Sequence, residues 1–454
     1  MNKELTSKEL NKFKSNFNKS KYNKLAANVV QKNGVLNSAL NGEAIRDLTP
    51  VFNIEVKDVG SVTNQKQSGR CWMFSGLNVV RGIVAKNLKV KDIELSENYL
   101  MFYDKLEKCN YQLEAAIDYI DEKPNSRQFD ILGSIGGQND GGFWHFFVDL
   151  VNKYGVCPKS VQEEVVASSA SGEMDAVLNT LIVKDMATLR SLRRAGKTKD
   201  DLRNEKEGML EEIYRVLAIC LGTPVGEFVY EYMEDAPTKE EKEEAKEESK
   251  FRRIKTTPKD FAKKYLTKDL NDFVLLVNWP IRGYKTYEVY TIKDCYNVKG
   301  APTFTAINVP IEEMKDSAIK AMKDNNPLWF GCDVGAESFR KEGYLAPEAI
   351  NLNDLFSINL KFDKGDRLQL RASSCTHAMT LTGVNLDDAD KPNRWKVQNS
   401  WGTDVGVKGI YIMSDRWFDE YVYEIVIDKK YLSDKVYKLL DKEPKALDLW
   451  EPVN

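Results

Sequence analysis

Histidine is nearly missing from this chain of 454 residues, in which only His145 and His377 occur. Cysteine is sparse as well, with seven residues spread between Cys71 and Cys375 and no C-x-x-C pair. This scatter argues against a disulfide framework and against a zinc cage. Most of the cysteines are therefore expected to be buried, reduced thiols, as suits a reducing cytosol.

The sequence also lacks long apolar runs and an excess of charge of one sign. No stretch reaches the roughly 18 apolar residues that a membrane span needs. The first 34 residues are rich in Lys, Asn and Ser and contain no apolar block of the signal-peptide type. With 66 basic and 69 acidic residues, the net charge of −3 argues against a dedicated nucleic-acid-binding protein. We expect a cytoplasmic protein without a membrane partner.

What is present divides the chain into five segments with different patterns. They are a polar helical arm (1–50), a helical half (51–162), a charged helical insertion (163–270), a β-rich half (271–440) and a polar tail (441–454). The arm is expected to pack on the body. Within the insertion, the run from Glu240 to Arg253 alternates in charge at helical spacing, which predicts a solvated helix face.

The clearest predicted helix begins at Cys71. Five apolar residues recur at spacings of three and four along one stripe: Met73, Leu77, Val80, Val84 and Leu88. Gly69 allows a tight turn into this helix, so Cys71 lies in its first turn. Further helices are expected from about Ser96 and over 144–153, and strands over 273–277, 395–398 and 421–427.

A cysteine at a helix start is a candidate nucleophile. The helix N-terminus and a neighbouring imidazolium both lower the pKa of a thiol. His377 is the expected partner, as the base that takes the thiol proton and the acid that protonates the leaving amine. The other histidine, His145, lies between aromatic residues at a predicted helix start, where packing is the simpler explanation.

Two further residues complete a set for acyl transfer. Asn399 follows a predicted strand, 22 residues after His377, in Asn399-Ser400-Trp401-Gly402, and would orient the imidazole. Trp401 would shield that hydrogen bond from water. Gln65, six residues before Cys71, would donate its amide to the developing oxyanion, together with the backbone N–H of Cys71.

These segments resemble the papain superfamily and, within it, the cytosolic bleomycin hydrolase and aminopeptidase C family. The resemblance rests on Ser68-Gly69-Arg70-Cys71-Trp72, on Thr376-His377-Ala378-Met379-Thr380 and on the stretch from Trp395 to Gly402. Trp72 is a supporting residue in this pattern. In papain-type enzymes the His follows the Cys by about 130–150 residues, whereas 306 residues separate them here. The region 163–270 supplies much of this difference.

The resemblance implies an α+β, papain-like fold with a helical half, an antiparallel β-barrel-like half and large helical and hook-like insertions. It also implies a homohexamer whose active sites face an inner chamber. Asp140, Gly141 and Gly142 match the family's glycine pair along the cleft, and Ala378 is expected to contact substrate too. Phe143 and His145 stand where relatives have Gln and Asp, so the substrate subsites differ in detail.

The C-terminal tail bears on specificity. In the family's aminopeptidases the terminal carboxylate lies in the cleft and receives the α-amino group of the substrate. Here that carboxylate belongs to Asn454, and only two residues follow Pro452, fewer than in those relatives. A short tail would let longer peptides pass, so oligopeptidase or endopeptidase cleavage is the alternative to aminopeptidase cleavage.

We therefore predict a cytosolic cysteine peptidase that hydrolyses peptides through a thioester acyl-enzyme, without a metal or an organic cofactor. A nucleic-acid-binding chamber is the rival from another class. Its support is a local excess of basic residues over 184–206, with eight basic and four acidic side chains. A catalytically inactive scaffold has little support because all four catalytic residue types are present.

Overall fold

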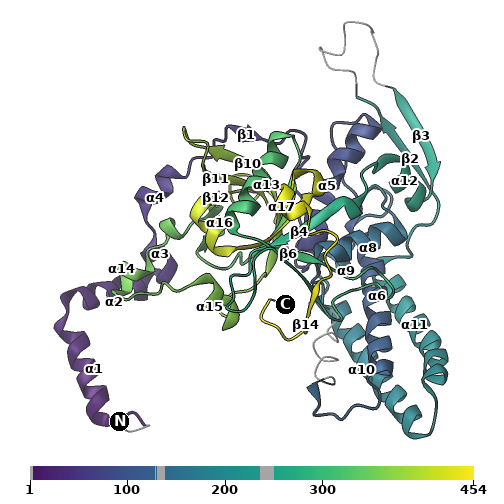
Figure 1. Ribbon diagram of the computed structural model, residues 1–454, viewed down its shortest axis with the longest axis horizontal. Helices are drawn as coiled ribbons and strands as arrows, with labels where there is room; N and C mark the ends of the chain where they lie inside the picture. Colours follow the sequence, from purple (N-terminus) through teal and green to yellow (C-terminus); the bar gives the residue numbers. More distant parts are fainter. Residues whose placement is uncertain (1–3, 128, 130–138, 236–249, 454) are drawn as a thin grey trace, which may run out of the picture.

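A group of helices and one large β-sheet pack against each other, and an N-terminal arm extends away from the sheet side of the molecule (Figure 1). The computed structural model describes residues 4–127, 129, 139–235 and 250–453. In this part of the chain no helix has the length and apolar character needed to cross a membrane. The arrangement is α+β, as predicted from the sequence.

The helical half is built around α5, which begins at Cys71 as predicted. All five residues of its apolar stripe are buried. The next helix starts after Ser96, whose side chain accepts a hydrogen bond from the backbone N–H of Tyr99 and so caps the helix. The principal helices are α5 (Cys71–Leu88), α6 (Glu97–Asp118), α8 (Trp144–Tyr154), α9 (Val166–Ser169) and α12 (Pro258–Tyr265).

The insertion consists of two long helices and a β-ribbon. Helices α10 (Gly172–Arg194) and α11 (Lys199–Leu221) lie beside α6 (Figure 1). Strands β2 (Phe228–Met233) and β3 (Phe251–Thr256) form the antiparallel ribbon. The helix predicted from Glu240 to Arg253 is wrong at its end, because residues 251–253 belong to β3. There the backbone pairing with β2 outweighs the helical spacing of the charges. Residues 240–249 lie outside the described residues.

The β half is a sheet whose described strands are ordered β14-β5-β6-β4-β13-β7-β10-β11-β12-β9-β8, with β1 also paired to β10. Most pairs are antiparallel, and β4–β6, β5–β14 and β9–β12 are parallel. The strands are β1 (Ile54–Glu55), β4 (Phe273–Val277), β5 (Glu288–Ile292), β6 (Ala306–Asn308), β7 (Leu328–Cys332), β8 (Ser338–Phe339), β9 (Tyr344–Leu345), β10 (His377–Leu386), β11 (Pro392–Gln398), β12 (Ile410–Ser414), β13 (Val422–Asp428) and β14 (Lys445–Leu447).

The two faces of the sheet belong to different hydrophobic cores. Successive side chains of a strand point to opposite faces, so in β7 Trp329 packs into the core shared with the helical half, whereas Phe330 packs into the core on the other side. That second core is covered by α13 (Ile311–Lys323) and α16 (Asp415–Tyr421). Shorter helices are α14 (Leu352–Phe356), α15 (Lys364–Gln369) and α17 (Asp434–Tyr437), with 3-10 turns η1 (Leu270–Asp272), η2 (Pro347–Ala349) and η3 (Lys429–Tyr431).

The N-terminal arm contains the predicted polar helices but does not pack on the body along its whole length. Helices α1 (Ser7–Lys19) and α2 (Lys21–Asn33) contain no buried residue. Contact with the body begins at α2, where the hydroxyl of Tyr22 donates a hydrogen bond to the carbonyl oxygen of Asp354 in α14. It continues through α3 (Val35–Ala39), after which Leu40 pairs with Ile350, and through α4 (Gly42–Asp47). The arm therefore contacts the body from α2 onward, whereas α1 leaves its large apolar side chains exposed.

Candidate active site

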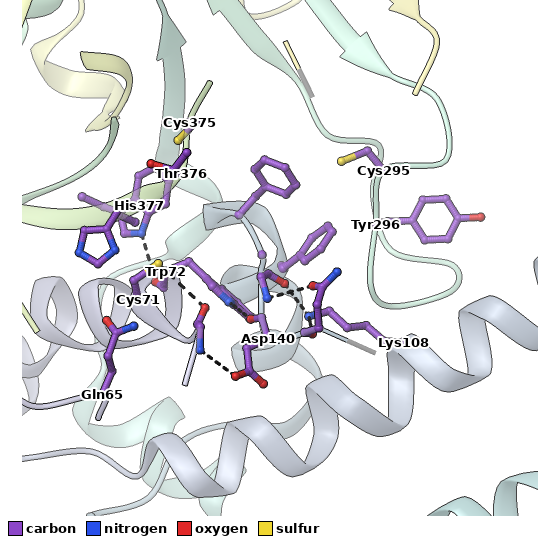
Figure 2. A pocket seen from close by; sticks show the side chains of 18 of the residues that line it. Gln65, Cys71, Trp72, Lys108, Asp140, Cys295, Tyr296, Cys375, Thr376 and His377 are labelled. Atoms are coloured by element: carbon purple, nitrogen blue, oxygen red, sulfur yellow. Dashed lines mark hydrogen bonds between the residues drawn. The ribbon is translucent and has the colours of Figure 1, made fainter. Parts of the chain in front are cut away.

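Cys71 and His377 open into the same cavity, although 306 residues separate them in the chain (Figure 2). Cys71 is the first residue of α5, and His377 is the first residue of β10. The backbone N–H of Ala378 donates a hydrogen bond to the sulfur of Cys71. The cavity has a volume of about 760 Å³ and lies between the helical half and the sheet.

The imidazole of His377 is held in one orientation. Antiparallel pairing of β10 with β11 brings the chain after Gln398 back to the start of β10, where Asn399 Oδ1 lies 2.9 Å from His377 Nε2. The backbone N–H of Ser400 also donates to this Oδ1, at 2.8 Å, which fixes the amide orientation. Since a carbonyl oxygen only accepts, Nε2 carries the hydrogen and Nδ1 is left to act as the base.

The environment of this pair is apolar. The ring of Trp401 lies against that of His377, with 4.7 Å between centroids, and Asn399 is fully buried. Burial lowers the pKa of His377 to about 4, against the opposing effect of the bond to Asn399. Burial also raises the pKa of Cys71, which the N–H of Ala378 partly offsets. Each group alone therefore favours its uncharged form, and a thiolate–imidazolium pair depends on both groups ionising together.

Gln65 also lines the cavity, and both ends of its amide are engaged. Its Oε1 accepts a hydrogen bond from Ser400 Oγ at 2.6 Å, and its Nε2 donates to the carbonyl oxygen of Ser68 at 2.6 Å. An amide nitrogen has two hydrogens, so one N–H remains for a group in the cavity. Ser400, which sequence reasoning treated only as part of a motif, thus contacts both Asn399 and Gln65.

Asp140 supports the start of the catalytic helix from the glycine-rich loop. Its carboxylate accepts from the backbone N–H of Gly69 at 2.7 Å and from Ser171 Oγ at 2.5 Å, and pairs with Lys105 at 2.8 Å. Its carbonyl oxygen accepts from Trp72 Nε1 at 2.6 Å. Asp140 lines the cavity, but these contacts engage its carboxylate within the protein. The carboxylate therefore holds the chain next to Cys71 in place.

The glycine pair lies where the loop meets the cavity. A Cβ on Gly142 would lie 2.5 Å from the ring of Trp72, so no larger residue fits there without displacing that ring. Lys108 donates to the carbonyl oxygen of Gly141 at 2.6 Å and to Asp104 at 2.7 Å, which fixes the loop to α6. Gly141, Gly142 and Ala378 all line the cavity, and their contact with substrate stays a prediction.

Sequence reasoning assigned no catalytic or binding role to several residues of the cavity. Lys108, Cys295, Cys375 and Leu449 line it. Cys375 precedes His377 by two residues, whereas the other three are distant in sequence from the catalytic motifs. Leu449 brings the C-terminal tail to the cavity, and Val453 is buried in the core shared with the helices. Asn454, whose carboxylate was predicted to meet the substrate, lies outside the described residues.

His145 occupies a different part of the site wall. It is half-buried in α8, where its ring stacks between those of Phe143 and Phe304, at 5.5 and 4.4 Å between centroids. Its Nε2 lies 3.1 Å from the carbonyl oxygen of Cys295, and burial lowers its pKa to about 3. This is a packed, neutral histidine. Among the described residues, no group of three or more His, Cys, Asp or Glu side chains is placed to hold a metal ion.

The comparisons with known proteins agree with this geometry. The model of the Peptidase C1-like family matches residues 4–454. The chain belongs to this family. It is a cysteine-type peptidase with a papain-like α+β fold, as the motifs predicted.

Individual relatives match along almost the whole chain. Aminopeptidase C of Lactobacillus helveticus is 37% identical over 93% of this chain and 92% of its own length. Aminopeptidase G of Lactobacillus delbrueckii subsp. lactis is 39% identical over 99% of both chains. The crystal structure of PepW from Lactobacillus rhamnosis HN001 superposes with a TM-score of 0.93 at 38% identity, covering 100% of this chain and 99% of that one.

Proposed function

We propose that this protein is an aminopeptidase that releases N-terminal residues from peptides through a thioester on Cys71. The observation that carries the proposal is the shared cavity of Cys71 and His377, with His377 Nε2 engaged by Asn399 and Nδ1 left as the base. Relatives named aminopeptidase C, G and E support the aminopeptidase mode.

Acylation uses three groups in fixed positions. His377 Nδ1 takes the proton from Cys71, and the sulfur forms a bond to the scissile carbonyl carbon. The resulting oxyanion accepts hydrogen bonds from the remaining N–H of Gln65 Nε2 and from the backbone N–H of Cys71. The imidazolium then gives its proton to the amine nitrogen, the C–N bond breaks, and the amine leaves a thioester behind.

Deacylation repeats these steps with water. His377 takes a proton from water while the water oxygen bonds to the thioester carbonyl carbon. The C–S bond then breaks, and the proton held on His377 returns to the sulfur. Burial of the pair beneath Trp401 keeps bulk water from competing for the imidazole proton.

The tail supports an N-terminal restriction on cleavage. Leu449 lines the cavity, the carbonyl oxygen of Trp450 accepts a hydrogen bond from Arg371, and Glu451 accepts from Tyr284 at 2.9 Å. The end of the chain is thereby tied beside the cleft. We propose that the terminal carboxylate closes one end of the cleft and receives the free amino group of the peptide.

The test compares a peptide with a free N-terminus and its N-acetylated form. We expect the native enzyme to hydrolyse the free peptide at its first bond and to leave the acetylated peptide intact. Cys71→Ala should lose hydrolysis of both, whereas Cys220→Ala, which removes a half-buried thiol of α11, should retain it. Internal cleavage of the acetylated peptide would reject the aminopeptidase mode, and turnover by Cys71→Ala would reject the cysteine mechanism.

We also propose a reducing compartment, such as the cytoplasm, because catalysis needs a free thiol at Cys71. All seven cysteines are free in the structure. The nucleic-acid alternative has less support, since basic side chains of α10 and α11 pair within the protein. Arg193 contacts Asp121 at 2.8 Å, and Arg203 and Lys206 contact Glu114 at 3.1 and 2.5 Å.

We propose that the protein assembles as a homohexamer through its arm. Three apolar side chains of α1 share one face at helical spacing and are about half exposed: Leu10, Phe13 and Phe17. The end of α14 and the segment that follows it expose four more apolar side chains: Phe356, Ile358, Leu360 and Phe362. Exposed apolar side chains gathered in this way are typical of surfaces that another chain covers.

A further inference from the structure

Glu424 is a buried carboxyl group to which no residue in the described part of the chain offers a cation. Its residue is 3% exposed, and its Oε2 has no hydrogen-bond partner among the described residues. Burial raises the pKa of Glu424 to about 7, with no charged neighbour acting on it. An uncompensated carboxyl group in a core costs stability, so its presence calls for an explanation in function.

The sheet places Glu424 at the end of a row of small residues that begins in the catalytic cavity. Ala378 of β10 pairs with Gly331 of β7, and Gly331 pairs in turn with Glu424 of β13. Paired residues point to the same face of a sheet, and this face is the one on which Trp329 and Ala378 line the cavity. Neighbouring strands lie about 4.8 Å apart, so Glu424 stands two strands from the residue that follows His377.

The missing side chain of Gly331 leaves room along this row. A Cβ on Gly331 would lie 3.0 Å from Glu424 Oε2 and 2.6 Å from Cys375 Sγ, so both side chains extend over the glycine. Cys375 lines the cavity, and its half-buried thiol stands between the cavity and the carboxyl group. The charge of Glu424 also acts on Cys295, a second cavity residue. A ligand in the cavity is thus separated from the carboxyl group by one small, rotatable side chain.

We propose that Glu424 is a specificity-determining residue at the end of the catalytic cavity, where its carboxylate receives a cationic group of the peptide on the acyl side of the cleaved bond. This group is the side chain of a Lys or Arg, since the α-ammonium group of the peptide is assigned to the terminal carboxylate. Both supply the N–H donors and the positive charge that the carboxylate lacks. The inference rests on the proposed peptidase function and names the part of the substrate that this site selects.

The test uses peptides that differ only in charge. One pair has Lys or norleucine at the first residue, and a second pair has Lys or norleucine at the second residue, all with a free N-terminus. In the native enzyme kcat/KM should be about ten- to a hundredfold higher for the cationic member of one pair, as a charged hydrogen bond in a buried site implies. The pair that shows the preference identifies the substrate residue that supplies the cation.

Two variants should remove this preference by different means. Glu424→Gln removes the charge and keeps the shape, so the ratio of kcat/KM should fall to within about threefold of unity, while the neutral peptide is cleaved at nearly the native rate. Gly331→Ala fills the space over the glycine and should remove the preference too. Glu443→Gln removes the same charge from an exposed position and should leave the ratio unchanged.

An unchanged ratio in Glu424→Gln would overturn the inference, and so would an equal loss for cationic and neutral peptides, which would mark Glu424 as purely structural. The absence of a preference in the native enzyme would overturn it as well. These outcomes are distinct from failure of the proposed function, in which the native enzyme would cleave none of the peptides.

Discussion

At the residue scale, the proposed catalysis depends on Cys71 and His377 ionising together. In the folded protein each of these two groups favours its uncharged form when the other is uncharged. Burial raises the pKa of the Cys71 thiol and lowers the pKa of His377 to about 4. In the proposed mechanism the thiolate and the imidazolium form together, because each charge offsets the burial of the other. The bond from Nε2 to Asn399 fixes which nitrogen takes part.

Removing the imidazole should therefore make Cys71 less reactive. In His377→Ala the burial that raises the pKa of Cys71 is no longer offset by a positive charge, so the thiolate fraction at pH 7 falls. We expect at least a tenfold lower rate of Cys71 alkylation at pH 7 and a midpoint of the pH–rate profile above about 8.5, the ordinary thiol value.

This rate is measured with iodoacetamide over a pH series, with Cys71 identified among the seven cysteines by peptide mass spectrometry. His145→Ala serves as the control, since it removes the other imidazole, which contacts Cys295. Its profile should match that of the native protein. Equal profiles for His377→Ala and the native protein would show that no ion pair forms.

The sequence made much of this residue-scale site predictable. Gly69 and the apolar stripe after Cys71 are local signals, and they located the catalytic helix start correctly. Glu424 could not be found in this way. It lies in a strand between Tyr423 and Ile425, and its importance comes from facing Gly331, a strand partner 93 residues earlier in the chain. Local patterns carry no information about such cross-strand neighbours.

At the element scale, a buried ion network joins four segments behind the nucleophile. Lys105 of α6 is fully buried and contacts Asp140 of the glycine loop at 2.8 Å and Asp175 of α10 at 2.6 Å. Burial of Asp140 raises the pKa of its carboxyl group, but the positive charge of Lys105 outweighs this effect and lowers that pKa to about 2. Asp140 in turn accepts from Gly69, just before α5. The position of Cys71 is thus linked to the insertion.

Breaking this network should destabilise the fold. Lys105→Met keeps the length of the side chain but leaves the buried carboxylate of Asp140 and the half-buried carboxylate of Asp175 without their cation. We expect a loss of about 3–5 kcal/mol in the free energy of unfolding, because unpaired buried charges are costly. Urea unfolding followed by tryptophan fluorescence measures this loss.

Lys255→Met is the matched control for that change. Lys255 of β3 and its partner Glu227 are both exposed, and the two side chains pair at 2.8 Å. Exposed pairs contribute little, so the loss should stay below about 1 kcal/mol. Similar losses for both lysine variants would show that the contribution of Lys105 to stability does not come from its burial between two acidic side chains.

The elements themselves were predictable to different degrees. Strands β4, β11 and β13 and helices α5, α6 and α8 follow apolar patterns that local sequence shows. Strand β3 was misread as part of a helix because charged residues at 251–256 satisfy both periods, and its pairing with β2 decides between them. The network of Lys105 was missed, since its acidic partners lie 35 and 70 residues away in the chain.

At the scale of the whole molecule, the arm is the part that the fold of one chain leaves unexplained. Helices α1 and α2 extend away from the sheet (Figure 1) and bury none of their residues. Isolated helices of 13 residues are marginal in water. Their apolar side chains thus need a partner surface, and the proposed hexamer supplies one.

Deleting residues 1–33 should abolish assembly and leave the fold intact. The two helices that the shortened chain loses contain no buried residue, so its unfolding midpoint should stay close to that of a monomeric full-length variant. Multi-angle light scattering after size exclusion should give about six times 51.8 kDa for the full chain and the mass of one chain for the deletion.

A variant with Leu10, Phe13 and Phe17 all changed to Glu keeps the arm's length and should also be monomeric, because the apolar face is replaced by charge. A full-length protein that runs as a monomer, or a deletion that keeps the full mass, would assign the arm another role.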